Sequence, residues 1–332
     1  MLTFENVILH ILDSEHNTCV ISDECMDETD ETLDTILQSK ATKIFASAQK
    51  KKGVFQEGSA FRECVERYKD GQVSFEEMSE KIARSIFDVK MKYGLYASSD
   101  LIVAIVMNEG RRYLIGIDNA FHEGITHDIR QSDKTCNVIC SSSSLISSNL
   151  IKDDRVFLVE LSDLSVSTIE TKIEIEAEKV NVFADIILQT SNEPSYKEAM
   201  KSISKTCEMI VDKYDMNEME ILPKMKGIIQ ENVTAQTPIN IEEVANVLFV
   251  DKPLAKSEFK EELKTKGVEK DVEVEYVKPT KADVVQKIKT DRGIELIIPI
   301  DFMNSKDLVE FQNNPDGTIS IQLKNIMHIS SK

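Results

Sequence analysis

Apolar and polar positions along the first ninety residues predict two short strands followed by three helices. The strands are expected over 5–13 (ENVILHILD) and 18–22 (TCVIS), joined by a polar turn at Ser14–Asn17. Apolar side chains then recur at helical spacing, and Thr29 or Asp30 suits the N-cap of the first helix. We expect these helices over about 30–53, 59–69 and 75–91.

The pattern becomes strand-like beyond residue 100. LIVAIVMN (101–108) is a continuous apolar run of strand length, and Glu109-Gly110 separates it from RRYLIGID (111–118), which predicts a β-hairpin. A mostly antiparallel sheet with the early helices packed on it follows from this hairpin and from further strand-like runs. Those runs lie at about 122–130, 135–140 and 155–161.

Helical periodicity returns at about residue 179, so we place a boundary near 178, between domains 1–178 and 179–332. Helices are expected near 179–190, 194–214 and 216–232, and in INIEEVANVLF and AKSEFKEELKTK after Pro238. The end is β-rich: GIELIIPID, then DLVEFQ and TISIQL around the turn Asn314-Pro315-Asp316-Gly317. The expected fold class is α+β: a mostly antiparallel sheet with packed helices, a helical middle and a small mixed α/β C-terminal subdomain.

Net charge is the feature that most restricts function. The 332 residues carry a net charge of −18, and residues 1–40 contribute ten acidic side chains against Lys40 alone. Taken by itself, this balance opposes non-specific binding to DNA, which depends on neutralising phosphates with lysine and arginine. Local basic surfaces are therefore where any nucleic-acid contact has to be sought.

Three basic clusters answer that description, and each has an alternative explanation. Lys50, Lys51 and Lys52 close the first predicted helix, where they could contact phosphates or simply complement the helix dipole. Lys256, Lys260 and Lys264 recur every four residues in a predicted helix–turn–helix, either as a phosphate-binding stripe or as a solvated helix face. The third cluster is the most basic stretch of the second half: Lys278, Lys281, Lys287, Lys289 and Arg292.

Catalytic chemistry has little support. His122, His127 and Asp128 match no metal-binding spacing, and the chain has no Walker sequence, no G-x-G-x-x-G and no H-E-x-x-H motif. Cys136 and Cys140 form one C-x3-C pair without the second pair that a structural zinc site needs. We therefore expect no enzyme activity, no cofactor and no metal.

The order of segments resembles the bacterial 37-kilodalton nucleoid-associated protein family over nearly the whole chain. The resemblance lies in VILHILDSEHNTCVISDE, in DLIVAIVMNEGRRYLIGIDNAFHEGITHDI, and most of all in SEFKEELKTKG followed by DRGIELIIPIDFMNSKDLVEFQNNPDGTISIQL. It implies a non-catalytic protein of the bacterial nucleoid and carries over no DNA-contacting residue.

Two functions fit both the charge and the resemblance. In the first, local basic patches contact DNA phosphates directly, without reading bases. In the second, the acidic protein is an adaptor that reaches the nucleoid by binding a DNA-metabolic enzyme. No run reaches the roughly 18 to 20 apolar residues of a membrane span, and the N-terminus lacks a signal peptide, so we expect a cytoplasmic, nucleoid location and no membrane contact. A homodimer is expected only from the general prevalence of two-fold oligomers.

Overall fold

The computed structural model describes residues 2–26, 31–95, 97–131, 135–142, 146–269, 271–274, 285–303 and 305–328. The chain forms two compact units, Met1–Ser195 and Tyr196–Lys332. This division lies after the boundary that we placed near 178, because Val182, Phe183, Ile187 and Leu188 belong to the buried core of the first unit.

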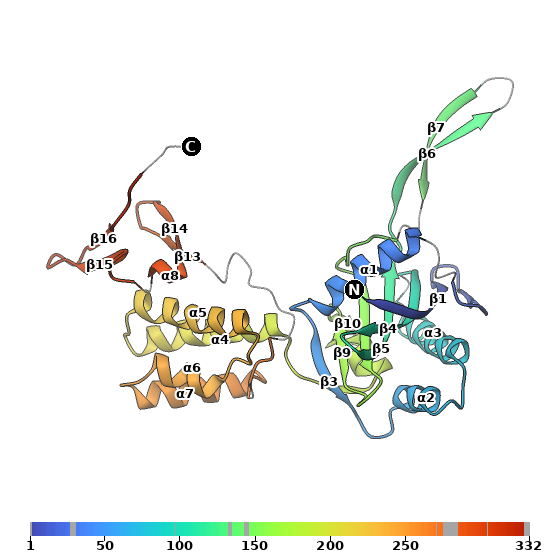
Figure 1. Cartoon of the computed structure of the whole chain (residues 1–332), viewed down its shortest axis with the longest axis horizontal. Coiled ribbons are helices and arrows are strands. Elements are labelled where there is room, and N and C mark those ends of the chain that lie inside the picture. The colour runs from blue at the N-terminus through green and yellow to red at the C-terminus, as the bar shows by residue number, and fades with distance from the viewer. Residues whose placement is uncertain are drawn as a thin grey trace. The chain divides into compact units, whose positions relative to one another are not determined.

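The first unit is built on one eight-stranded sheet, shown in Figure 1, with the strand order β12-β3-β9-β8-β5-β4-β1-β2. Every neighbouring pair is antiparallel, which confirms the predicted sheet. Its strands are β1 (Thr3–Asp13), β2 (Thr18–Val20), β3 (Lys51–Phe55), β4 (Ser99–Asn108), β5 (Arg111–Ala120), β8 (Arg155–Glu160), β9 (Val166–Ile169) and β12 (Thr190–Asn192).

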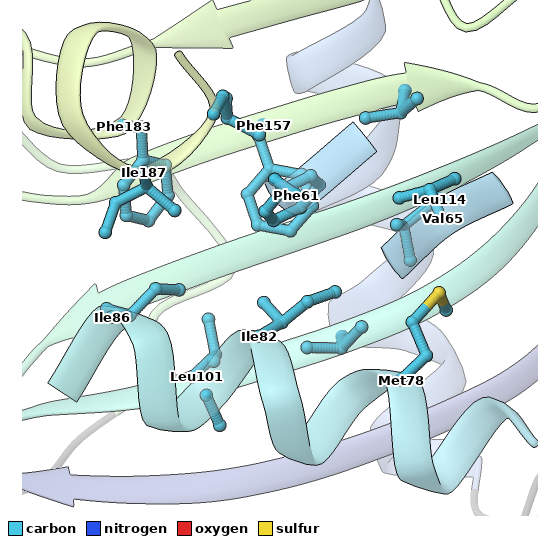
Figure 2. Close-up of a cluster of buried hydrophobic side chains, with 14 of the residues drawn as sticks. Phe61, Val65, Met78, Ile82, Ile86, Leu101, Leu114, Phe157, Phe183 and Ile187 are labelled. Carbon is cyan, nitrogen blue, oxygen red and sulfur yellow. The ribbon is translucent and has the colours of Figure 1, made fainter. Parts of the chain in front are cut away.

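Helices cover both faces of this sheet, so its inner strand β4 is apolar on both sides. On one face, α1 (Glu31–Phe45) packs Leu37 and Ile44 against Ile102 and Ala104. The other face is covered by α2 (Ala60–Lys69), α3 (Phe75–Lys92) and the π-helix η1 (Val182–Ile187). Figure 2 shows this second cluster, in which Ile82 and Ile86 of α3 lie over Leu101 of the sheet.

Local sequence signals explain several of these elements. Ser74 and Glu77 form a reciprocal capping box at the start of α3, next to the first residue of the helix predicted over 75–91. At the predicted turn between β4 and β5, Glu109 and Gly110 both have positive φ, 49° and 79°, which suits the right-handed twist of a two-residue hairpin.

Two predicted helices were wrong in extent. The first helix ends at Phe45, not near Gly53, because β3 pairs with β9 and β12 and buries alternate side chains between them. The segment 179–190 is not one helix, because β11 (Glu178–Val180) occupies its start and η1 follows. β11 forms a small hairpin with β10 (Ile173–Ile175).

A separate two-stranded hairpin extends from the first unit, as Figure 1 shows. It consists of β6 (Gly124–Gln131) and β7 (Thr135–Ser142), which pair along their whole length and with no other strand of the described chain. We call this hairpin the β-arm.

The second unit begins with four helices, which confirms the predicted helical middle. They are α4 (Tyr196–Lys213), α5 (Glu218–Ala235), α6 (Ile241–Leu248) and α7 (Pro253–Thr265). Phe249 and Phe259 pack with ring centroids 5.2 Å apart between α6 and α7. The C-terminal part contains β13 (Val285–Lys289), β14 (Glu295–Pro299), α8 (Ile300–Met303), β15 (Val309–Asn313) and β16 (Ile319–Leu323).

The C-terminal strands form the two small hairpins β13–β14 and β15–β16. Gly317 has a φ of 83° in the predicted Pro-Asp-Gly turn, a conformation that glycine adopts without strain. Within the described ranges, no helix is both long enough and apolar enough to cross a membrane.

Candidate nucleic-acid interface

The first predicted cluster does not form a phosphate-binding helix end. Lys50 lies in the loop after α1 and donates a hydrogen bond from its ammonium to the carbonyl of Phe45, which ends that helix. Lys51 and Lys52 begin β3, where Lys51 is buried and Lys52 is exposed. Because Lys51 and Lys52 are consecutive strand residues, their side chains point to opposite faces of the sheet and do not share one surface.

The second cluster lies on α7 as predicted, but carboxylates neutralise it. Glu242 of α6 reaches both Lys256, at 3.1 Å, and Lys260, at 2.7 Å. These hydrogen bonds, with Lys260 the stronger contributor, hold the pKa of Glu242 below its usual value. Lys264 lies 3.4 Å from Glu269. The stripe is therefore paired within the protein itself.

The third cluster is divided between a strand and a turn. Lys287 and Lys289 lie on the exposed face of β13, and Arg292 lies in the turn before β14. Lys289 is 3.6 Å from Glu295, whereas Lys287 and Arg292 contact no carboxylate of the described residues. Lys278 and Lys281 fall outside the described residues. Residues 285–289 form a strand, in which buried Gln286 and Ile288 alternate with exposed lysines.

A fourth lysine stripe, which our sequence reasoning missed, lies on the first three turns of α4. Lys197, Lys201 and Lys205 recur every four residues, and all three are exposed. None of them forms an ion pair with a carboxylate within the described part of the chain. The signal was present in the sequence, as YKEAMKSISK has the same spacing that drew attention to α7.

Two effects oppose this arrangement in an isolated protein. Like charges four residues apart on a helix repel one another. The positive end of the helix dipole also disfavours Lys197 in the first turn, where Glu198 partly offsets the effect. On α7, Glu242 and Glu269 pair with the lysines and reduce their mutual repulsion, whereas the three α4 lysines form no ion pair within the described residues. The α4 stripe is therefore an exposed cationic surface at which a bound external anion would reduce the repulsion among the lysines.

The predicted catalytic candidates do not assemble. His122 precedes β6, His127 lies on the β-arm, and the described residues contain no group of three side chains placed to hold a metal ion. His122 lies outside the strand, because β6 begins at Gly124.

Sequence reasoning also missed a buried charge network between β5 and its covering helices. Lys90 of α3 lies 3.0 Å from Asp118, and Arg155 lies 3.4 Å from the same carboxylate. Burial would raise the pKa of Asp118, but Lys90, Arg155 and a hydrogen bond from Ser99 together lower it below its usual value. These contacts keep Asp118 ionised inside the protein.

The opposite face of the sheet repeats this arrangement. Lys40 of α1 lies 3.5 Å from Asp154 and also donates to Asn119. Burial lowers the pKa of Lys40, and Asp154 partly offsets the effect. Asp154 in turn accepts hydrogen bonds from the backbone N–H groups of Ala120 and Ile151, at 3.2 and 3.1 Å. The network therefore fixes the chain just before and after the segment that carries the β-arm.

An α+β protein with local cationic surfaces on an acidic chain is the class that the structure defines. Over residues 8–329, the sequence matches the family described as nucleoid-associated protein YejK. The chain belongs to this family, as the sequence resemblance indicated. A search of the curated proteins found no match.

Proposed function

We propose that the protein is a non-catalytic component of the bacterial nucleoid in the cytoplasm that contacts DNA phosphates through local lysine surfaces, without reading bases. The observation that carries this proposal is the α4 stripe of Lys197, Lys201 and Lys205, which is exposed and has no carboxylate partner in the described chain. Membership of a nucleoid-associated family supports DNA as the anion. Lys287 and Arg292 are the further candidates from the original clusters.

The mode of contact follows from the side chains present. Lysine ammonium groups recognise phosphate as point charges, and successive stripe positions are about 6 Å apart along the helix. No aromatic side chain lies between the three lysines, so stacking on unpaired bases is not favoured. We expect sequence-independent binding that weakens steeply with salt, because each phosphate contact releases counterions.

Fluorescence anisotropy of a labelled duplex at two salt concentrations tests this proposal. The test variant changes Lys197, Lys201 and Lys205 to Gln. A second variant changes Lys278, Lys281, Lys287 and Arg292 to Gln. The matched control changes Lys256, Lys260 and Lys264, which removes the same charge at the same helical spacing from a stripe already paired with carboxylates.

Loss of binding in the α4 variant, with the control close to wild type, would support phosphate contact on α4. Loss only in the second variant would move the contact to the basic stretch 278–292. Equal losses in the α4 variant and the control would contradict a contact confined to the α4 stripe. Absence of wild-type binding even at low salt would overturn direct DNA contact.

One observation favours the adaptor function as a second candidate. Beyond its basic start, α4 becomes acidic, and a pocket of about 320 Å³ is lined by Glu208, Asp212, Asp215 and Glu218 together with Val211 and Met216. Such a surface suits a basic segment of a DNA-metabolic protein. A photo-crosslinker placed at Asp212 in cells would attach to such a protein if the adaptor function holds, and to no protein if it does not.

A further inference from the structure

The β-arm exposes apolar side chains and pairs with no other strand of the described chain. Every residue of β6 after Gly124 is exposed, and β6 and β7 bond only to each other within the described chain. An isolated two-stranded hairpin is at best marginally stable in water, and three or more strands or a covering element are normally needed. The β-arm therefore lacks a covering surface of its own.

The exposed apolar side chains lie on one face. Ile125, Ile129 and Ile139 are 82%, 56% and 81% exposed. Side chains alternate along each strand, and His127 pairs directly with Ile139, so all three isoleucines share the face of His127. The opposite face carries Asp128 and Arg130. Three isoleucines gathered on one side of a projecting ribbon are typical of a protein-contact surface.

Charge distinguishes among the partners that could cover this face. Residues 124–142 contain Asp128 and Asp133 against Arg130 and Lys134, a net charge of zero in a chain of net charge −18. A DNA duplex would require several cations, whereas Arg130 lies on the face away from the isoleucines. A basic protein would be attracted to the acidic surfaces rather than to this neutral ribbon. A second copy of the same apolar face is self-complementary and carries no aspartate, glutamate, lysine or arginine.

We propose that two copies of this chain associate through the isoleucine faces of their β-arms, about a two-fold axis. Eight residues of strand span about 27 Å, which exceeds the Debye length of roughly 8 Å at physiological salt. Two arms that pack face to face and point in opposite directions therefore keep the rest of each acidic chain too far from the other for strong electrostatic repulsion. One ribbon face buries on the order of 300 Å² per copy, well below a standard interface, so the dimer is weak and reversible.

Sedimentation equilibrium of the full chain measures this association directly. Between about 1 and 100 µM, the wild type should shift from the monomer mass towards its double, as expected for a small interface. Changing Ile125 and Ile139 to Lys should raise the dissociation constant at least about 100-fold, because two apolar contacts are lost and like charges face each other. A second variant, Ile125→Thr with Ile139→Thr, keeps the β-branched side chains of the ribbon and should raise the constant at least about tenfold.

Val54→Lys is the matched control, because Val54 is a β-branched strand residue, 69% exposed, outside the β-arm. Its dissociation constant should equal that of the wild type, and circular dichroism should show all variants folded. A wild type that stays monomeric at every concentration overturns the proposal, as does a Thr variant that dimerises unchanged. If the wild type is monomeric and the Thr variant loses DNA binding, the β-arm contacts nucleic acid instead of a second copy.

Discussion

The ammonium of Lys90 lies 3.0 Å from the carboxylate of Asp118, and these two side chains are only 3% and 1% exposed. Consecutive residues of β5 point to opposite faces of the sheet, so Asp118 meets Lys90 of α3 while Asn119 meets Lys40 of α1. Two helices on opposite faces are thus joined through one pair of strand residues. The β-arm begins a few residues later, so this pair anchors its base.

Removing one member of the buried pair should destabilise the first unit strongly. Lys90→Met leaves Asp118 with Arg155 as its remaining cation, and we expect a loss of about 3 to 5 kcal/mol in the free energy of unfolding. Urea denaturation followed by circular dichroism measures this change. Arg84→Met is the control on the same helix, because the Arg84–Glu80 pair is solvent-exposed and should leave the midpoint unchanged. Equal midpoints for Lys90→Met and the wild type would contradict the anchoring role.

A buried histidine should make stability depend on pH between about 4 and 6.5. His10 of β1 is fully buried, its Nδ1 accepts a hydrogen bond from the backbone N–H of Ser22, and burial lowers its pKa to about 4, partly offset by Glu80. The unfolded chain therefore binds a proton in this window that the folded chain does not. Stability from this group is complete above pH 6.5 and falls as pH drops towards 4, by about 3 kcal/mol at most.

The variant His10→Asn isolates that contribution, because the asparagine oxygen can replace Nδ1 as the acceptor for Ser22. Urea midpoints measured from pH 4 to pH 7 should show a flatter slope for His10→Asn than for the wild type. Parallel slopes would mean that other groups cause the pH dependence.

A glycine in the centre of the sheet is required by an aromatic ring opposite it. Gly116 of β5 pairs directly with Phe157 of β8, and a Cβ atom at residue 116 would overlap that ring. Phe157 also packs against Phe61, with ring centroids 5.2 Å apart, so it cannot move without disturbing the core. Gly116→Ala should cost about 1 to 3 kcal/mol of stability.

A double-mutant cycle tests whether the ring is the cause. Phe157→Leu creates space beside residue 116, so Gly116→Ala should cost less when combined with Phe157→Leu than it does in the wild type. Calorimetric or urea unfolding of the four proteins provides the comparison. Strict additivity of the two changes would show that the cost arises from something other than the ring.

Sequence patterns predicted those elements whose determinants are local. The hairpin of β4 and β5 follows from an apolar run and the Glu109-Gly110 turn, and α3 follows from its Ser74 cap. The end of α1 could not be predicted in this way, because Lys51 belongs to a strand only through pairing with Thr168, far along the chain. The buried Lys40 was recognisable in principle, since it shares the helical spacing of Leu37 and Ile44.

The candidate site also depends on contacts between distant residues, which the sequence pattern does not predict. The α4 and α7 stripes have the same spacing of lysines in sequence, yet only the α7 stripe meets a carboxylate from another helix. Glu242 lies on α6, and its distances to Lys256 and Lys260 depend on how two helices pack. Periodicity can therefore locate a cationic stripe but cannot tell whether the folded protein has already neutralised it.

Removing the Glu242 carboxylate should create a second cationic surface, on α7. Glu242→Gln leaves Lys256 and Lys260 without their shared partner, so DNA affinity at low salt should rise several-fold. The salt dependence should also steepen, by up to about 2 in the slope of log K against log salt if both ammonium groups then contact phosphates. Anisotropy titrations of the wild type and this variant at several salt concentrations measure both effects.

The reciprocal change provides the control for this prediction. In the wild type, Lys256→Gln with Lys260→Gln should alter DNA affinity little, because Glu242 already occupies both ammonium groups. In the Glu242→Gln background, the same two changes should abolish the gain. If they weaken binding as much in the wild type as the α4 changes at Lys197, Lys201 and Lys205 do, then DNA displaces Glu242 and the α7 stripe is part of the interface.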